Sequence, residues 1–328
     1  MPSLLDPISE SAKILLIGDQ SAGKTGAKAS LIAMGYKLLM IDTDKGFKIL
    51  RALLTDSRYP YKAYMEKHGI RPEENISYIP IDVPMDFKSE NIKGTQWNIL
   101  SPMSSSAWST VINLLREWKD GQKSWGSIND WDSDTILDFD TMSTLAEIAK
   151  YWVQDMNGHL GALVDDHGRD TGGAQEMIMR LMTKVTSSSV RCNVIITAHI
   201  KRVDMSADVP QSPEQRLREK KAIDPKGFPA VIGQAVSPYI GKKFNDQFIV
   251  KQDGDGNRGT RRIYTVPTDN VGAKNSVYLE PSYDLTSGLA EIFCALQYKD
   301  PPTDLINAMK PKSEGPPPGP IASGFGKR

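Results

Sequence analysis

The stretch ILLIGDQSAGKTGAKASLIAMG, residues 14–35, decides the fold of this chain. It begins with a short apolar run that is typical of a buried strand, and it ends with apolar residues at helical spacing. Between the two lies a glycine-rich bend with the pattern G-x-x-x-x-G-K-T, from Gly18 to Thr25. A strand, such a bend and a helix in this order form the context in which the pattern binds phosphate groups.

Each residue type in this bend has a role in phosphate binding. The glycines let backbone N–H groups turn inward toward an anion, and the positive end of the following helix adds to their field. We expect the Lys24 amine to reach the β- and γ-phosphates and the Thr25 hydroxyl to ligate Mg²⁺. The predicted nucleotide-binding residues are Gly18, Asp19, Gln20, Ser21, Ala22, Gly23, Lys24, Thr25 and Gly26.

Composition limits the class of protein that these 328 residues form. The formal net charge of +0 provides no overall field for a polyanion, so any nucleic-acid surface must be a local patch. Two cysteines make neither a disulfide framework nor a metal cluster. No apolar run reaches the roughly 18 residues of a membrane span, and the first residues lack the layout of a signal peptide. We therefore expect a cytoplasmic protein.

Short apolar strands alternate with helical patterns along the chain. Strands are predicted at 37–42, 134–140 and 192–200, and helices at 107–118, 144–153 and 174–186. This alternation predicts an α/β fold around a mostly parallel sheet, in which ligands bind beyond the carboxyl ends of the strands.

The chain is expected to form one domain with flexible ends. We predict an N-terminal extension at 1–12, the α/β domain at 13–300 and a flexible tail at 301–328, whose end is rich in proline and glycine. Within the domain, the polar segment 202–229 contains four prolines and predicts a mobile loop. The region 242–284 contains a predicted β-hairpin that turns at residues 253–259.

Carboxylates follow two of the predicted strands. In MIDTD, strand alternation would place Asp42 and Asp44 on the same side, where one of them could deprotonate an attacking water. A helix cap or a solvated loop aspartate explains the same pattern. In DTILDFD, P-loop chemistry calls for an aspartate that holds Mg²⁺. Asp140 is preferred because it lies at the end of the strand, and Asp138 is the alternative.

A histidine follows the strand NVIITA. A polar side chain at this place could touch a γ-phosphate and distinguish ATP from ADP. A capping or packing role for His199 is the competing interpretation.

Taken together, the order of these motifs resembles the RecA-like recombinase ATPases, most closely the short phage-borne members associated with single-strand annealing. The resemblance covers roughly 13–284. A family glutamate that activates water corresponds to Asp44 in MIDTD, and DTMSTL is similar to the magnesium-aspartate segment, which implies Asp140. NVIITAHIKR is similar to the segment that ends in a γ-phosphate-sensing glutamine, with His199 in its place.

The resemblance also implies partners. Two family loops bind single-stranded DNA, and they correspond to 165–173 and roughly 202–229. Cations there could neutralise phosphates, although a solvated charged loop explains them equally well. The predicted DNA-binding residues are Arg169, Lys201, Arg202, Arg216, Arg218, Lys220 and Lys221.

A further family segment reaches across a subunit interface. VGAKNSVYLEP is similar to it, which implies that Lys274 approaches the γ-phosphate of a neighbouring subunit in a homo-oligomer. Arg261 and Arg262 could reach the same place. The tail could bind a single-strand-binding protein or act as a spacer.

The resulting expectation is an ATPase that uses Mg²⁺ and ATP and couples its nucleotide state to single-stranded DNA in phage-type recombination, annealing or repair. Its predicted catalytic residues are Asp44, Lys24, His199 and Lys274. Three alternatives stay open: a small-molecule phosphotransferase, a ring helicase or helicase loader, and an ATP-gated binding protein with little turnover.

Overall fold

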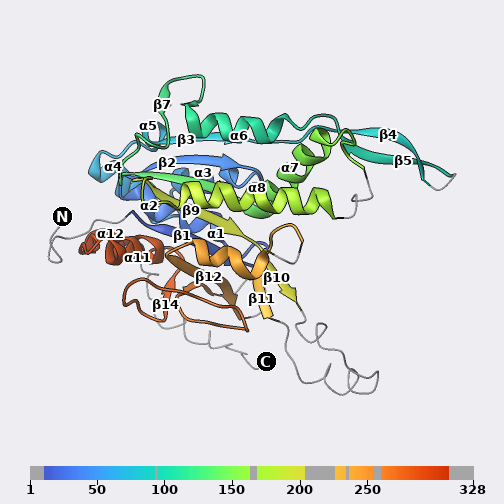
Figure 1. Ribbon diagram of the computed structural model, residues 1–328. Coiled ribbons are helices and arrows are strands. Elements are labelled where there is room, and N and C mark those ends of the chain that lie inside the picture. Colours follow the sequence, from blue (N-terminus) through green and yellow to red (C-terminus); the bar gives the residue numbers. More distant parts are fainter. Residues whose placement is uncertain are drawn as a thin grey trace, which may run out of the picture.

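The computed structural model describes residues 11–92, 95–162, 168–203, 226–233, 236–254 and 260–309. Within these ranges, eight strands form a central sheet (Figure 1). Their order across the sheet is β14 (Ser282–Asp284), β13 (Thr260–Tyr264), β12 (Asp246–Asp253), β1 (Lys13–Gly18), β9 (Asn193–Ala198), β8 (Thr135–Asp140), β2 (Lys37–Asp42) and β3 (Ile76–Pro80). The strands from β12 to β3 run parallel, and β13 and β14 are antiparallel. The predicted α/β fold with a mostly parallel sheet is confirmed.

Strand β1 shows why the parallel strands are continuous apolar runs in the sequence. Leu15 and Ile17 pack into the core on one face of the sheet, and Ile14 and Leu16 pack into the core on the other face. Parallel strands are typically buried on both faces, because helices cover both sides. The apolar run at residues 14–17 therefore serves two cores at once.

Helices cover the two faces of the sheet. On one face lie α6 (Ser106–Arg116), α7 (Met142–Met156), α8 (Arg169–Val185) and the short α10 (Ser237–Ile240), which is followed by a 3₁₀ turn (Gly241–Lys243). The other core is built from α1 (Lys24–Ala27), α2 (Ala29–Ala33), α3 (Phe47–Thr55), α4 (Pro60–His68), α11 (Gly288–Leu296) and α12 (Thr303–Met309). In Figure 1, β3 and β2 lie toward the top of the sheet with α6 above them, and β12 and β14 lie toward the bottom. None of the helices in the described ranges is long and apolar enough to cross a membrane.

Three two-stranded sheets in the described ranges are separate from the central sheet. The hairpin of β4 (Met85–Ile92) and β5 (Thr95–Pro102) projects away from the body (Figure 1), and β6 (Trp118–Lys119) pairs with β7 (Ser124–Gly126). A single short helix, α5 (Pro72–Asn75), precedes β3. Strand β10 (Ile200–Val203) pairs with β11 (Lys226–Pro229), so the ends of the predicted mobile loop are strands. The residues between these two strands lie outside the described ranges.

The C-terminal part differs from the prediction in two ways. The hairpin of β12 and β13 is confirmed, but β12 also pairs in parallel with β1 and so belongs to the central sheet. The tail was predicted to begin at residue 301, whereas 303–309 form α12. Leu305 and Met309, four residues apart, share one face of this helix and are buried in the core. The rest of the predicted tail, 310–328, lies outside the described residues.

The place of β12 in the core leads to a stability prediction. Phe248 is fully buried and pairs with Leu16 in register, so Phe248→Ala should lower the free energy of unfolding by about 3–5 kcal/mol. Ile49 is 59% exposed, and Ile49→Ala should change it by roughly 0.5 kcal/mol or less. Urea denaturation of both variants measures the difference, and equal values would contradict the assignment of β12 to the core.

Candidate functional site

The bend after β1 can close only with glycine at two positions. Gly23 has a φ of 106°, which is a left-handed conformation, and a Cβ there would lie 2.5 Å from the Leu285 side chain. A Cβ on Gly18 would collide with the backbone carbonyl of Val250 on the neighbouring strand. The glycines of the predicted phosphate loop thus meet a steric requirement of this fold.

Lys24 is a buried amine with neutral hydrogen-bond partners. Its Nζ donates to the carbonyl oxygens of Gly18 at 2.8 Å and Asp19 at 2.9 Å, and it lies 3.4 Å from Nδ1 of His199. Burial lowers the pKa of Lys24 to about 8, although the carboxylates of the site oppose this shift. This amine is therefore placed to donate its hydrogen bonds to a bound anion in place of the loop carbonyls.

Asp140 receives hydrogen bonds from two other elements of the site. Its carboxylate accepts the hydroxyl of Thr25 at 2.5 Å and that of Thr197 at 2.6 Å, and it lies 3.2 Å from Nζ of Lys28. Burial alone would raise the pKa of Asp140, but Lys28 and the two hydroxyls hold it below its ordinary value. Because Thr25 donates its proton to Asp140, its oxygen keeps lone pairs for a cation.

The backbone of a third element approaches this pair closely. A Cβ on Gly46, at the start of α3, would lie 2.7 Å from Oδ2 of Asp140 and 3.0 Å from Oγ1 of Thr25. Only glycine leaves that space open. The peptide bond between Asp140 and Thr141 is cis.

A second carboxylate lies deeper on the same strand. Asp138 is fully buried, and its Oδ2 accepts a hydrogen bond from Nζ of the equally buried Lys28 at 2.6 Å. Within the described residues, Oδ1 of Asp138 has no hydrogen-bond partner. Burial raises the pKa of Asp138, while the two carboxylates raise the pKa of Lys28 against the opposing effect of burial.

The two carboxylates of MIDTD have different partners. Asp42 accepts the backbone N–H groups of Gly46 at 2.8 Å and Phe47 at 3.1 Å and so caps the start of α3. Strand β2 ends at Asp42, so the predicted alternation does not extend to Asp44. Strand alternation therefore does not place the Asp44 side chain, and Asp42 serves as a cap, the competing interpretation of this pattern.

Asp44 instead belongs to a group of polar side chains beside the phosphate loop. It accepts the hydroxyls of Thr144 at 2.5 Å and Thr141 at 3.2 Å, and its Oδ2 lies 3.4 Å from Nε2 of His199. The two ring nitrogens of His199 thus face Asp44 on one side and Lys24 on the other. About a third of each of the Asp44 and His199 side chains is exposed.

The structure brings together five of the residues predicted from the sequence. Lys24 and Thr25 follow β1, Asp44 follows β2, Asp140 ends β8, and His199 follows β9. Sequence reasoning missed Lys28 and Thr197. Lys28 lies four residues after Lys24, a spacing that puts both on one side of a helix, and this was the available signal.

Lys274 does not lie beside the phosphate loop of its own chain. Its Nζ donates to the carbonyl of Phe244 at 2.8 Å, and its backbone pairs with Gln247. Gln247 is opposite Leu15, three residues before the loop glycine Gly18, so Lys274 does not reach its own phosphate loop.

The arginines suggested for the same role are placed differently. A Cβ on Gly23 would lie 3.3 Å from Cδ of Arg261, so Arg261 lies beside the phosphate loop of its own chain. Arg262 donates to Ser282 Oγ on the neighbouring strand. Neither observation requires a second subunit.

The predicted DNA-binding residues are only partly described. Arg169 begins helix α8, so 169–173 are helical and not part of a loop. In β10, Lys201 donates to the carbonyl of Gly233 and Arg202 to that of Asp269. The remaining four, Arg216, Arg218, Lys220 and Lys221, lie outside the described residues.

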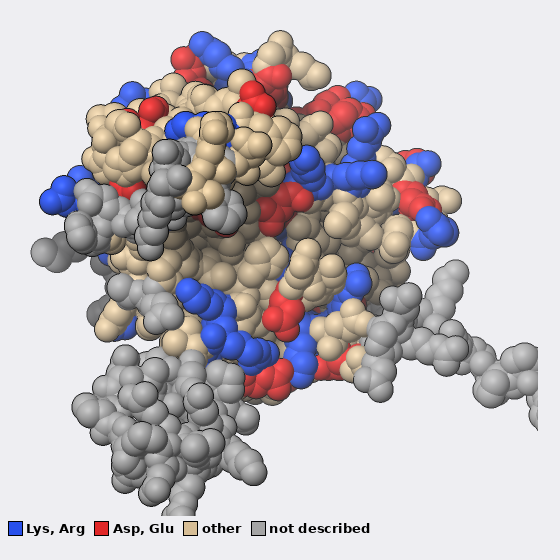
Figure 2. Space-filling view, turned by 90° about the vertical axis from the view of Figure 1, so that its right-hand side faces the viewer, with Lys and Arg blue, Asp and Glu red and all other residues tan. Residues whose placement is uncertain are grey.

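Charges are mixed on the face where the parallel strands end. The strands point toward the right-hand side of Figure 1, and Figure 2 shows that side. Small groups of lysine and arginine alternate there with aspartate and glutamate, and the described residues form no continuous basic surface.

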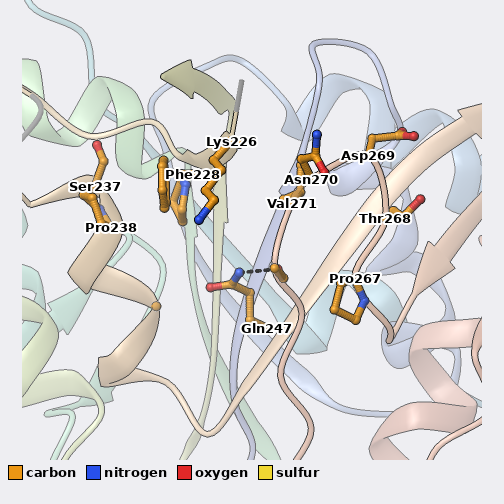
Figure 3. A pocket seen from close by; sticks show the side chains of 14 residues that line it. Lys226, Phe228, Ser237, Pro238, Gln247, Pro267, Thr268, Asp269, Asn270 and Val271 are labelled. Carbon is orange, nitrogen blue, oxygen red and sulfur yellow. Dashed lines mark hydrogen bonds between the residues drawn. The ribbon is translucent and has the colours of Figure 1, made fainter. Parts of the chain in front are cut away.

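A cavity of about 630 Å³ lies beside β11 and α10 (Figure 3). Phe228, Pro238 and Pro267 supply apolar side chains to it, and Gln247 donates to the carbonyl of Gly272 at its edge. Its lining includes no residue of the phosphate loop and none of the site carboxylates. The cavity is therefore distinct from the site around Lys24.

Comparison with known proteins assigns no family to the chain. No family model and no curated protein matches it. Among solved structures, the RadB recombinase aligns over 81% of this chain and 91% of its own at 11% identity, with a TM-score of 0.37. The flagellar accessory protein FlaH from Methanocaldococcus jannaschii aligns over 83% of this chain and 84% of its own at 10% identity, with a TM-score of 0.36.

A KaiC-like protein from Pyrococcus horikoshii aligns over 78% of both chains at 11% identity, with a TM-score of 0.34. At these identities and scores, the likeness establishes neither a family nor an activity.

The different partners of Asp42 and Asp44 lead to a prediction. Asp42→Ala removes the acceptor for two N–H groups of α3 and should lower the free energy of unfolding by about 1 kcal/mol. Asp44→Ala, which removes a partly exposed side chain, should change it by roughly 0.5 kcal/mol or less. Urea denaturation at neutral pH measures both, and a larger loss for Asp44→Ala would contradict this division of roles.

Proposed function

We propose that this protein binds ATP with Mg²⁺ and hydrolyses it at the site around Lys24. One observation carries the proposal: polar groups from the ends of four parallel strands meet at one phosphate-type loop. These groups are the buried amine of Lys24, the hydrogen-bonded pair of Thr25 and Asp140, the carboxylate of Asp44 and the imidazole of His199. This is the edge of an α/β sheet at which ligands bind.

The residues present fit the two implied ligands. A phosphate would give the buried Lys24 amine the anionic partner that its neutral contacts do not supply. The Thr25 oxygen and the ionised Asp140 match the oxygen ligands that Mg²⁺ prefers. When bound, the ion would neutralise charge on the β- and γ-phosphate oxygens.

The polar side chains beside the loop have separable tasks in this mechanism. The Asp44 carboxylate orients the attacking water and accepts its proton. His199, which lies between Asp44 and Lys24, links the carboxylate to the phosphate-binding amine. Loss of the γ-phosphate would therefore alter the surroundings of Asp44 through the His199 side chain.

The residues beyond this site support a wider proposal. In the resemblance to RecA-like ATPases, nucleotide state is coupled to single-stranded DNA in phage-type recombination, annealing or repair. Lys201 and Arg202 lie on β10, directly after His199, so the site connects by backbone to the segment with the predicted DNA-binding cations. Lys274, remote from its own loop, would act only in a homo-oligomer. A single-strand-binding protein remains the proposed partner of the tail.

A second candidate is an ATP-gated binding protein with slow turnover. Both oxygens of Asp44 already accept threonine hydroxyls, so the proton of an attacking water would compete with these two hydrogen bonds. For a phosphotransferase, an acceptor pocket should face the loop, and the 630 Å³ cavity does not include loop residues in its lining.

The lowered pKa of Lys24 predicts how ATP affinity changes with pH. Bound phosphate favours the charged amine, so binding above a pKa of about 8 requires proton uptake. Affinity should be nearly level up to about pH 7 and about tenfold lower at pH 9. Calorimetry at constant ionic strength measures this, and Lys24→Arg, which stays charged, should show no such fall. A level wild-type profile would contradict the proposed role of Lys24.

Hydrolysis with and without DNA tests the wider proposal. ATP turnover should rise when single-stranded DNA is added, and the increase should shrink at higher salt because phosphate contacts release counterions.

The role of Asp44 is tested by substitution. Asp44→Asn should retain ATP binding and lose turnover, with Lys24→Ala as the control that loses binding. Turnover that ignores DNA at every salt concentration would count against the recombinase function, and unchanged turnover in Asp44→Asn would exclude Asp44 as the base.

A further inference from the structure

A buried lysine joins the two carboxylates of strand β8. Nζ of Lys28 lies 2.6 Å from Asp138 and 3.2 Å from Asp140, and the side chains of Lys28 and Asp138 are 0% exposed. An ammonium group in a protein core is costly unless it is paired. Its role in this core therefore needs an explanation.

The shorter contact identifies the counter-ion of this lysine. Asp138 lies two residues before Asp140, on the same face of β8 and about 6.6 Å deeper along the strand. Lys28 and Asp138 together form a neutral pair beneath the site. The charge of Asp140 is then left available to the space beside Thr25.

The contacts of Asp140 also indicate that Lys28 is the partner of Asp138 and that the charge of Asp140 stays available. Besides the longer contact to Lys28, it accepts hydroxyl protons from Thr25 and Thr197, two neutral groups that orient it without cancelling its charge. A cation that used Asp138 instead would have to displace Lys28 inside a core closed to solvent.

We infer that Lys28 is a positioning residue which, paired with Asp138, sets the divalent-ion affinity of the site by leaving Asp140 as the uncompensated carboxylate of strand β8. This inference rests on the proposed function. It also assigns Asp138 to the lysine and not to the metal.

Charge counting gives opposite expectations for the single and the double variant. In Asp138→Asn, Lys28 retains only Asp140 as its partner and neutralises it, so divalent-ion binding weakens. In Lys28→Met with Asp138→Asn, the neutral pair is removed as a unit and Asp140 is again uncompensated. If Asp138 were a metal ligand, the double variant would still lack that ligand, so its Mg²⁺ affinity would stay well below the wild-type value.

The experiment is a Mg²⁺ titration of ATP binding, read by fluorescence of a labelled ATP analogue and not by turnover. The Mg²⁺ concentration at half-saturation should rise about tenfold or more in Asp138→Asn. In the double variant it should return to within about threefold of the wild-type value. An unchanged value in Asp138→Asn, or no recovery in the double variant, would overturn the inference.

Thermal unfolding without ligand provides an independent measure of the same pair. Lys28→Met alone leaves two buried carboxylates without a cation and should strongly lower the melting temperature or prevent folding. The double variant should melt well above Lys28→Met. A double variant no more stable than Lys28→Met would also overturn the pairing. Failure of the wild-type protein to bind the ATP analogue at any Mg²⁺ concentration would refute the proposed function, and the melting comparison would still test the pair.

Discussion

The Asp140 carboxylate is the point on which the site depends, because it joins the phosphate-loop helix to the middle of the sheet. It accepts hydroxyls from Thr25, which follows β1, and from Thr197 on β9, while Lys28 approaches from the same segment as Thr25. Three charged or polar donors around one buried carboxylate satisfy it and orient it at the same time. Asp140 therefore links the phosphate loop directly to strand β8.

Strand order explains why the contacts of Asp140 are possible. β9 lies between β1 and β8, so Thr197 separates the loop strand from the carboxylate strand, and His199 emerges between Lys24 and Asp44. Parallel pairing brings all four strand ends to one edge of the sheet. Side chains that lie 100 or more residues apart in the chain thus share one candidate site.

Local sequence patterns predicted which residues lie at the candidate site better than they predicted the hydrogen-bond and ion-pair partners of those residues. The loop, Asp140 and His199 follow from motifs placed at strand ends, which is a local property of the sequence. Spacing alone did not separate Asp42 from Asp44, because their partners depend on where β2 ends and on Thr141 and Thr144 at the start of α7. Lys28, which lies between α1 and α2, was missed because lysine side chains are normally solvated, and only the contact with β8 shows that this one is buried.

The sequence by itself determined the α/β class, the phosphate loop and the set of polar groups at the strand ends, because strand and helix periodicity and glycine geometry act over a few residues. The tertiary structure alone decided which carboxylate receives which donor, and that β12 joins the sheet beside β1. It also showed that 303–309 pack as a helix. These outcomes depend on burial and on contacts between distant segments, which local composition does not specify.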